Sequence, residues 1–558
     1  MTRVARAAGS ADPPPVDAAT TGGSAPVAVA GLTRVLDVVG PTVAVLRRRV
    51  ARVPTALVAL GALVLFAAAT WYGVGGRAFR TWDFRDLDVY RAGAEALLRR
   101  APLYSAHPPH SDLLFTYPPF AALVFVPLEL GPVELARLAV TACSLAAAVV
   151  IAHAGLRGAG RPTGWRTGWW SVALAAVALR SQPFSQTLHL GQVDLVVIAM
   201  VLADLLLVSA PRRGWLLGVA AGFKPTPLVL VGYLVLSRQW RAAAQAVLGF
   251  AATVGVGYLV LPGTSRRYWG TELLDTARVG SLSYVANQSL AAMWARATHD
   301  PHPGSRPTVT LGVLALVVGT AAVLGWLYRR TGAQAGPAVT DQAATGAGPG
   351  AAEPGRVLSF EALCLAGVAG LLASPVSWTH HWVWCLPITV ALVARWAGAR
   401  TDRAFWGWGS AALVWVAVFW SGPMWHTPRG RDLEFTDSWW QAVAADSYAL
   451  LGVGLLAAAL AYRAWPAAER LRRSAEARAG AVGVAGSGSG PRLGAGPASN
   501  APARADGGDT MASMVDKLMS YARSPKGQQL VEKARAAAEK PENQRKIMAL
   551  RDKLMRKV

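Results

Sequence analysis

Charge and cysteine are both scarce in this sequence. Only 16% of its 558 residues are charged, and its three cysteines, Cys143, Cys364 and Cys385, lie in or beside apolar runs without CxxC spacing. This pattern excludes a disulfide framework and a cysteine-based metal motif. Hydrophobic residues make up 53% of the chain and form long runs separated by short basic loops, which predicts an integral membrane protein rather than several soluble domains.

Acidic residues are fewer than basic ones. There are 32 Asp and Glu against 55 Lys and Arg, so the formal net charge is +23. Most of the excess lies in the N-terminal arm, in the loops between apolar runs and in the C-terminal tail. Because that distribution is typical of the positive-inside bias and of contact with anionic lipid, we do not expect a nucleic-acid partner.

The two ends of the chain differ in composition from its middle. No cleavable signal peptide is recognisable, and residues 1–50 are expected to form a disordered cytoplasmic arm before an apolar run that reads as a signal anchor. A helical membrane domain is expected over 51–465, a flexible linker over 466–510 and a short cytoplasmic tail of basic amphipathic helices over 511–558. The tail can be a small soluble appendage or can lie on anionic lipid.

The apolar runs predict an all-α, polytopic membrane protein with about ten spans, since a span needs roughly 20 apolar residues. We expect the spans near residues 54–74, 133–155, 169–181, 192–210, 242–262, 308–328, 357–374, 380–396, 404–422 and 441–463.

One further apolar run, residues 214–236, is interrupted in its middle by Lys224, Pro225 and Pro227. Its flanks, PRR and SRQWR, are both basic and therefore favour the same, cytoplasmic side. This combination predicts a re-entrant or two-half-helix hairpin.

With the N-terminus inside, nearly all the basic loops fall on the cytoplasmic face. The segments left outside hold most of the unusual polar and aromatic residues, which predicts an extracytoplasmic active face. These segments are 76–118, 180–191, 263–307, 374–380 and 423–440.

The first outer segment carries three acids within six residues, Asp83, Asp86 and Asp88. The stretch DLDVYRAGAEALLRR that includes the last two has an apolar stripe typical of a helix lying along the membrane surface. The acids can cap this helix and complement its dipole, or one of them can accept a proton from a substrate hydroxyl.

Three residues further along have both a structural and a functional interpretation. Tyr117 precedes two prolines, where it can mark a break before an apolar stretch or form a wall for a lipid tail or sugar face. Gln192 can line a wet cavity or hydrogen-bond another helix, and Lys224 can snorkel to the cytoplasm or attract a phosphate. Gln192 lies at the junction of two spans among further polar residues: Arg180, Gln182, Gln186, His189 and Asp194.

The outer segment 263–307 is basic, against the general bias, and an anionic ligand would explain the exception. Arg266 is one of its arginines. Asn287, Gln288 and Ser289 formally make an N-glycosylation sequon, but their place near an apolar helix favours a structural or substrate-binding amide.

Residues 374–384 read SPVSWTHHWVW. Because neighbouring residues do not share a helix face, His380 and His381 are not expected to bind one metal ion together, and no carboxylate lies nearby in the sequence. One histidine can hydrogen-bond the backbone where Pro375 breaks the helix, and the other can face a phosphate or sugar hydroxyl. Trp378 and the later tryptophans offer flat apolar faces for a sugar or an isoprenoid chain.

Seven segments carry a resemblance to a known family: DLDVYRAGAEALL, LYSAHPPHSDLLFTYPPFAALVFVPL, LGQVDLVVIAMVLADLLL, GVAAGFKPTPLVLVGYLVL, RYWGTELLDTARVG, ANQSL and SPVSWTHHWVW. In this order they resemble the polyprenol-phosphate-mannose-dependent alpha-1,2-mannosyltransferases of actinobacteria, multi-span enzymes of the GT-C class. The family pattern reads Lys-Leu-Thr-Pro where this chain has a second proline, Pro225, which bears on the local geometry of the hairpin.

The resemblance implies a GT-C-type helical bundle that transfers mannose by inverting displacement on the extracytoplasmic face of the cell membrane. The family's Asp-Leu-x-Val-Tyr pattern maps onto Asp86, which is then the general base, and Asp88 fills the variable position. The substrate contacts that carry over are Gln192, Lys224, Arg266, Asn287, Gln288, His380 and His381, and Asp88, Tyr117 and Trp378 are further candidates from their positions.

The partners implied are a polyprenyl-phosphate-mannose donor, a glycolipid or mannan acceptor and membrane lipid. No cofactor and no metal site are expected, and the metal requirement stays open. Three alternatives remain: an arabinofuranosyl transferase with a decaprenyl-phosphate donor, a lipid or solute transporter with the same broken hairpin, and a structural membrane partner.

Overall fold

The computed structural model describes residues 55–73, 82–300, 360–399, 401–459 and 461. All of them belong to one unit, residues 1–472. The N-terminal arm, the span expected near 308–328, the linker and the tail lie outside the described residues.

Within the described residues the regular structure is helical, apart from an isolated bridge between Asn287 and Trp378, so the all-α expectation is confirmed for this part. The first helices along the chain are α2 (Thr55–Gly73), α4 (Arg85–Leu98), α5 (Pro119–Glu129), α6 (Val133–Gly158), α7 (Trp165–Ala178), α8 (Gln182–Leu190), α9 (Asp194–Leu206) and α10 (Trp215–Phe223).

The later helices include a short 3₁₀ segment that carries both adjacent histidines. They are α11 (Val229–Leu236), α12 (Trp240–Val260), α13 (Pro262–Gly270), α14 (Leu290–Thr298), α16 (Phe360–Ala373), the 3₁₀ segment η7 (Thr379–Trp384), α17 (Cys385–Ala397), α18 (Asp402–Ser421), α19 (Trp439–Ala445) and Ser447–Ala459.

Several of these helices have the character of membrane spans. Val133–Gly158, Trp240–Val260 and Ala404–Ser421 are each long and apolar enough to cross a bilayer. Trp439–Ala445 and Ser447–Ala459 pass the same test together, although they are bent by 76° at Asp446. The protein is therefore a membrane protein, while the expected total of about ten spans stays a prediction.

The interrupted run at 214–236 folds as a helical hairpin. Helix α10 ends at Phe223 and a 3₁₀ turn begins at Thr226, so the chain breaks at Lys224 and Pro225 as expected. Gly214 packs on Ala242 and Gly222 packs on Thr253, which means that α10 runs parallel to α12. Helix α11 then returns toward the start of α12, since only Ser237 to Gln239 separate the two helices. Both basic flanks thus lie at the same end of the hairpin, and Lys224 lies at its tip.

Glycine lets the hairpin approach α12 closely. A Cβ atom on Gly218 would lie 2.3 Å from the carbonyl oxygen of Ala246, and one on Gly222 would lie 2.4 Å from the Thr253 hydroxyl. Small residues permit such close backbone contact between membrane helices, where packing replaces the hydrophobic effect as the source of stability.

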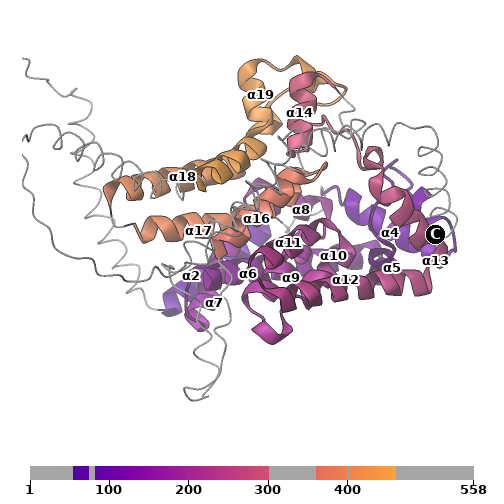
Figure 1. The fold of residues 1–558 in the computed structure, drawn as a ribbon, viewed down its shortest axis with the longest axis horizontal. Helices are drawn as coiled ribbons and strands as arrows, with labels where there is room; N and C mark the ends of the chain where they lie inside the picture. Colours follow the sequence, from indigo (N-terminus) through magenta and orange to yellow (C-terminus); the bar gives the residue numbers. More distant parts are fainter. Residues whose placement is uncertain (1–54, 74–81, 301–359, 400, 460, 462–558) are drawn as a thin grey trace, which may run out of the picture. The chain divides into compact units, whose positions relative to one another are not determined.

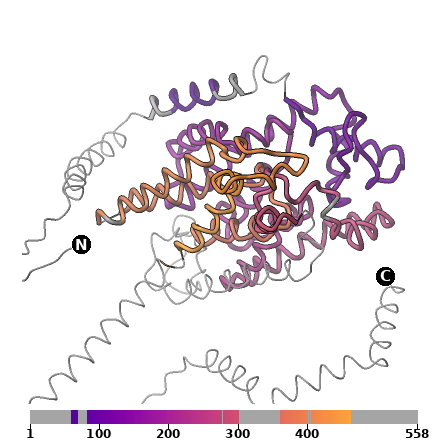
Figure 2. The backbone as a smooth tube through the Cα atoms, turned by 90° about the horizontal axis from the view of Figure 1, so that it is seen from above, coloured from indigo at the N-terminus to yellow at the C-terminus, as the bar shows by residue number. Residues whose placement is uncertain are grey.

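The remaining helices pack around α6, which contacts α7, α9 and α17, while α17 also lies along α18 (Figure 1). Helix α16 contacts α11, α17 and η7. Helices α4 and α5 lie at one end of this unit. The N-terminal end of α18 lies at the opposite end, as both Figure 1 and Figure 2 show.

Four chain segments converge between these helices. The residues before α4 reach the α8–α9 junction, where the Phe84 amide donates to the His189 carbonyl at 3.0 Å. The hairpin tip approaches the start of α9 through Lys224 and Asp194, and η7 contacts both α8 and α9. This convergence brings together residues that are almost 300 positions apart in the sequence.

Candidate functional site

The site contains Asp86 in the first turn of α4. Its Oδ2 accepts a hydrogen bond of 2.9 Å from Nε2 of Gln192, which lies just before α9. Gln192 is buried, whereas Asp86 is only partly buried and keeps some contact with solvent. The Gln192 amide therefore holds one carboxylate oxygen of Asp86, and the residue stays partly exposed.

Two tyrosines fix the orientation of that amide. Gln192 Oε1 accepts hydrogen bonds from the Tyr90 hydroxyl at 2.7 Å and from the Tyr117 hydroxyl at 3.1 Å. An amide oxygen that accepts two hydroxyl protons must present its NH₂ group in the other direction, which here is toward Asp86. We call Asp86, Tyr90, Tyr117 and Gln192 the Gln192 network.

A second group of polar side chains lies beside this network. Nζ of Lys224, at the hairpin tip, is 2.7 Å from Oδ1 of Asp194 and 2.8 Å from Nε2 of His381. The same ammonium lies 5.9 Å from the centre of the Tyr117 ring, so the two groups adjoin. We call Asp194, Lys224, His380 and His381 the Lys224 cluster.

His380 differs from its neighbour in its hydrogen bonds. It is 6% exposed, and neither of its ring nitrogens has a hydrogen-bond partner among the described residues. Its Nε2 lies 3.7 Å from Oδ2 of Asp194, an oxygen that is also buried without a hydrogen bond in that part of the chain. Buried polar atoms rarely lack partners, so these unpaired atoms distinguish His380 and Asp194 from most of the described interior.

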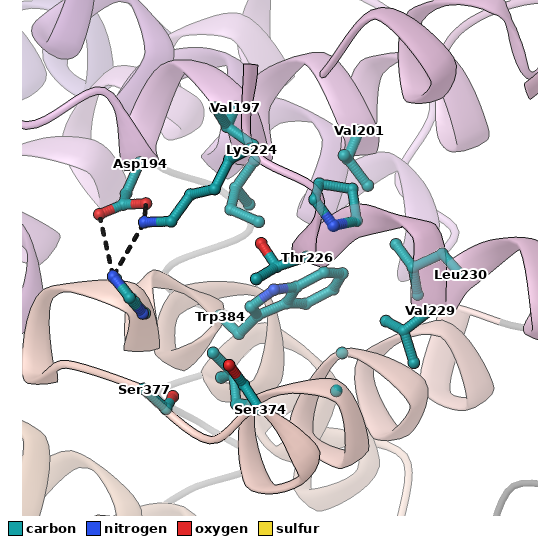
Figure 3. A pocket seen from close by; sticks show the side chains of 16 residues that line it. Asp194, Val197, Val201, Lys224, Thr226, Val229, Leu230, Ser374, Ser377 and Trp384 are labelled. Atoms are coloured by element: carbon teal, nitrogen blue, oxygen red, sulfur yellow. Dashed lines mark hydrogen bonds and ion pairs between the residues drawn. The ribbon is translucent and has the colours of Figure 1, made fainter. Parts of the chain in front are cut away.

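A pocket begins at this cluster and continues between α9, the hairpin and α16. Figure 3 shows Asp194 and Lys224 at one end of the pocket, with Trp384 near its middle and Val229 and Leu230 toward the other end. His381 also lines the pocket, whereas His380 does not belong to its lining. The pocket thus combines a charged end with long apolar walls.

The backbone before α4 holds Asp86 in place. Phe84 has a left-handed conformation with φ of 47°, which is uncommon for an aromatic residue, and it is fully buried. Across from it, Gly191 has φ of 68°, and a Cβ atom there would lie 2.8 Å from Cβ of Leu87. Only glycine therefore lets the α8–α9 turn approach α4 so closely.

Asn287 and Gln288 belong to neither group, and their side-chain amides form hydrogen bonds with the backbone. Both are fully buried. Asn287 Oδ1 accepts from the Ser377 amide at 2.9 Å, and its Nδ2 donates to the Pro375 carbonyl at 3.2 Å. Gln288 Oε1 accepts from the Tyr448 amide at 3.0 Å. These contacts fix the segment that leads into η7 and join it to the C-terminal helices.

A buried ion pair supports this loop. Nε of Arg296 donates to Oδ1 of Asp446 at 3.0 Å, and the same guanidinium donates to the carbonyls of Ser283, Tyr284 and Asn287 at 3.0 to 3.2 Å. Asp446 lies at the bend after α19, so the pair links that bend to the loop that holds η7.

Three other predicted site residues lie outside the two groups. Asp88 is on another face of α4, among the charges of Arg137 and Arg91. Arg266 is exposed on α13. Among the described residues, it forms no hydrogen bond or ion pair with the Gln192 network. Trp378 packs on Gly280 and on the edge of the Tyr284 ring, at the entry to η7.

Two residues of the site were absent from the predicted set. Asp194 follows Gln192 by two positions and begins α9, so an acid in the first turn of a span was the available signal. Tyr90 follows Asp86 by four positions, which places both on one face of α4. The stretch D-x-x-x-Y could have identified it.

Burial and charge decide how Asp86 titrates. Burial raises the pKa of Asp86 to about 6, the Gln192 hydrogen bond opposes this rise, and the charge of Asp194 adds to it. A carboxylate with a pKa close to neutrality is suited to general base catalysis, because it is ionised at pH 7 and still basic enough to accept a proton.

The histidines and Asp194 also form a set of possible metal ligands. One donor atom of each of Asp194, His380 and His381 lies within 4.8 Å of the other two. The carboxylate that appeared to be missing near the histidine pair is therefore supplied by a residue far away in the sequence.

Comparison with known proteins identifies relatives over most of the membrane domain. A model described as Glycosyltransferase family 87 matches residues 115–347. A polyprenol-phosphate-mannose-dependent alpha-(1-2)-phosphatidylinositol pentamannoside mannosyltransferase of Mycobacterium tuberculosis is 36% identical over 353 residues, which are 61% of this chain and 73% of that protein. A polyprenol-phosphate-mannose-dependent alpha-(1-2)-phosphatidylinositol mannoside mannosyltransferase of Mycolicibacterium smegmatis is 32% identical over 407 residues, 69% of this chain and 85% of that protein. No solved structure matches the chain significantly.

Proposed function

The chain belongs to glycosyltransferase family 87, with the polyprenol-phosphate-mannose-dependent mannosyltransferases as its relatives, and we propose that it transfers mannose to a phosphatidylinositol mannoside. The donor is polyprenyl-phosphate-mannose, and the product has an alpha-1,2 linkage. The relatives do not favour the arabinofuranosyl transferase or the transporter. The observation that carries the proposal is the position of the half-buried Asp86 carboxylate next to the charged end of a pocket with apolar walls.

Asp86 is the general base of the proposed reaction. Its ionised form accepts the proton of the acceptor hydroxyl as that oxygen attacks C1 of mannose and the bond from C1 to the phosphate oxygen breaks. One displacement inverts the configuration at C1. Gln192 holds the carboxylate by donating to Oδ2, which leaves Oδ1 for the acceptor.

The Lys224 cluster is the proposed site of the leaving phosphate. The ammonium of Lys224 supplies a fixed positive charge beside the pocket, and charge that develops on a leaving group is stabilised by such preorganised groups. The isoprenoid chain of the donor lies along the apolar walls, against Val229, Leu230 and Trp384. Arg266 and Trp378 stay candidate contacts for the outer parts of the substrates.

The hairpin supports an extracytoplasmic orientation of this site. Its two basic flanks belong on the cytoplasmic side, and its tip faces Thr253, past the middle of α12. A tip at that depth carries Lys224 into the outer half of a membrane layer that α12 crosses. We therefore propose that the chain crosses the membrane several times and that its site faces the extracytoplasmic side.

The test is transfer by the purified protein in proteoliposomes. Labelled polyprenyl-phosphate-mannose is supplied with phosphatidylinositol mannosides of different mannose number, and the product linkage is determined. We expect one additional mannose in alpha-1,2 linkage on one of these acceptors. Absence of transfer to every phosphatidylinositol mannoside, with transfer to an unrelated acceptor, would contradict the proposed acceptor class.

A further inference from the structure

The Lys224 cluster has the composition of a divalent-metal site. Nε2 of His380 is 3.7 Å from Oδ2 of Asp194, and Nε2 of His381 is 4.0 Å from the same oxygen. Two imidazoles and one carboxylate are a common donor set for transition metals. All three side chains are at least 89% buried, so they offer these atoms inside the protein rather than to bulk water.

A cation already lies among these ligand atoms, and it belongs to the chain. Lys224 Nζ is within hydrogen-bond distance of Asp194 Oδ1, at 2.7 Å, and of His381 Nε2, at 2.8 Å. An ammonium group can only donate, so Nε2 of His381 must accept and its proton must lie on Nδ1. That is the tautomer that would present Nε2 to a metal ion.

The ammonium and a divalent ion cannot share this place. Both would contact Asp194 and His381, and two positive charges a few ångströms apart repel strongly where little water screens them. Whichever cation is present therefore excludes the other. In this chain the covalently attached one has the advantage, because it never dissociates.

Lysine is rare in the part of the sequence that forms this site. Lys224 is the single lysine among residues 1–516, a stretch whose other permanently charged basic residues are all arginine. An ammonium is a compact point charge, whereas a guanidinium is a broad plane. Within residues 1–516, lysine thus occurs only at the position where the cation contacts Asp194 and His381.

We propose that Lys224 is a built-in cation occupying a latent transition-metal site formed by Asp194, His380 and His381. Removing its charge opens that site to a divalent ion. The inference concerns metal binding and does not depend on the identity of the substrates. It also explains the unused polar atoms of the cluster: Asp194 Oδ2 and His380 Nε2 remain in ligand positions while Lys224 takes up the other atoms.

The test is direct titration with Co²⁺, whose visible absorption reports imidazole and carboxylate ligation. The proteins are purified without a polyhistidine tag, and the variants are K224M, which removes the charge at similar length, and K224R, which retains it. We expect K224M to bind one Co²⁺ at least about tenfold more tightly than the wild-type protein, because the positive charge that repels the metal ion is gone. K224R, which keeps the charge, should bind Co²⁺ no more tightly than the wild-type protein.

Further variants assign the ligands. D194N in the K224M background should abolish the absorption band, whereas H110A in the same background should leave it unchanged, since His110 is exposed and lies outside the cluster. K224Q replaces K224M if the latter elutes as aggregate in size-exclusion chromatography. The proposal is overturned if the wild-type protein binds Co²⁺ through Asp194 as tightly as K224M, or if a monodisperse K224M or K224Q protein binds no better than the wild type.

Discussion

The Gln192 amide donates to Asp86 while its oxygen is held by Tyr90, at 2.9 and 2.7 Å respectively. This relationship fixes the direction of the carboxylate through a residue in the α8–α9 turn, 106 positions away in the sequence. An Asp86 without this hydrogen bond would have lost one of the interactions that lower its pKa.

Replacing Gln192 by Leu should therefore move the pH profile of transfer. Loss of the hydrogen bond raises the pKa of Asp86 further above 6, so the acidic limb of the kcat profile should shift to higher pH. The matched control is Y117F, which removes one hydroxyl from the network but leaves Tyr90 to orient the amide. An unchanged acidic limb in Q192L would contradict the link between these two residues.

The wild-type enzyme should itself lose activity on the acidic side. The pKa of Asp86, about 6, lies above that of a solvated Asp because of burial. The base is protonated below this pKa and ionised above it, so kcat should rise with pH through about 6 and level off near neutrality. Measurement in proteoliposomes between pH 5 and pH 8 tests this, and a rate that stays flat through that range argues against Asp86 as the titrating base.

Asn287 and Gln288 should behave as positioning residues. N287A leaves the Ser377 amide without its partner, which costs about 1–3 kcal/mol for a buried group, whereas the Pro375 carbonyl keeps its hydrogen bond from the Ser289 hydroxyl. We expect a lower thermal midpoint and a lower kcat with little change in the KM for the donor. A large rise in KM with an unchanged thermal midpoint would instead support the substrate contact that the sequence pattern suggested.

The Arg296–Asp446 pair should be more important for stability than for chemistry. Truncating one partner of a buried ion pair leaves an uncompensated charge and typically costs about 3–5 kcal/mol. R296M should therefore lower the thermal midpoint strongly, and R296M combined with D446L should recover part of the loss. If the double variant is no more stable than R296M alone, the coupling between loop and bend is absent.

The sequence predicted the parts of this site that local chemistry determines. Lys224 and Pro225 had to break an apolar helix, and two basic flanks had to lie together, so the hairpin could be expected. The acids at the start of α4 pointed to Asp86. These features depend only on neighbouring residues and on the properties of a bilayer.

The sequence could not predict which distant groups would meet. Asp194 pairs with Lys224 across 30 positions and lies beside histidines more than 180 positions away, and no local pattern records such contacts. An amide in an apolar context is equally suited to a sugar and to backbone, so Asn287 and Gln288 needed the fold to reveal their partners. Only the face of α4 on which each residue lies distinguishes Asp86 from Asp88.

The central claim is that Asp86 removes the proton from the acceptor hydroxyl, and it is tested most directly by comparing D86N with D83N. Asp83 is an exposed acid in the same segment that pairs with Arg85, so D83N controls for the loss of a charge there. Single-turnover transfer is measured with labelled donor, and donor binding is measured separately. We predict that D86N binds donor and transfers no mannose, while D83N transfers at a rate close to wild type. Normal turnover by D86N would contradict the account.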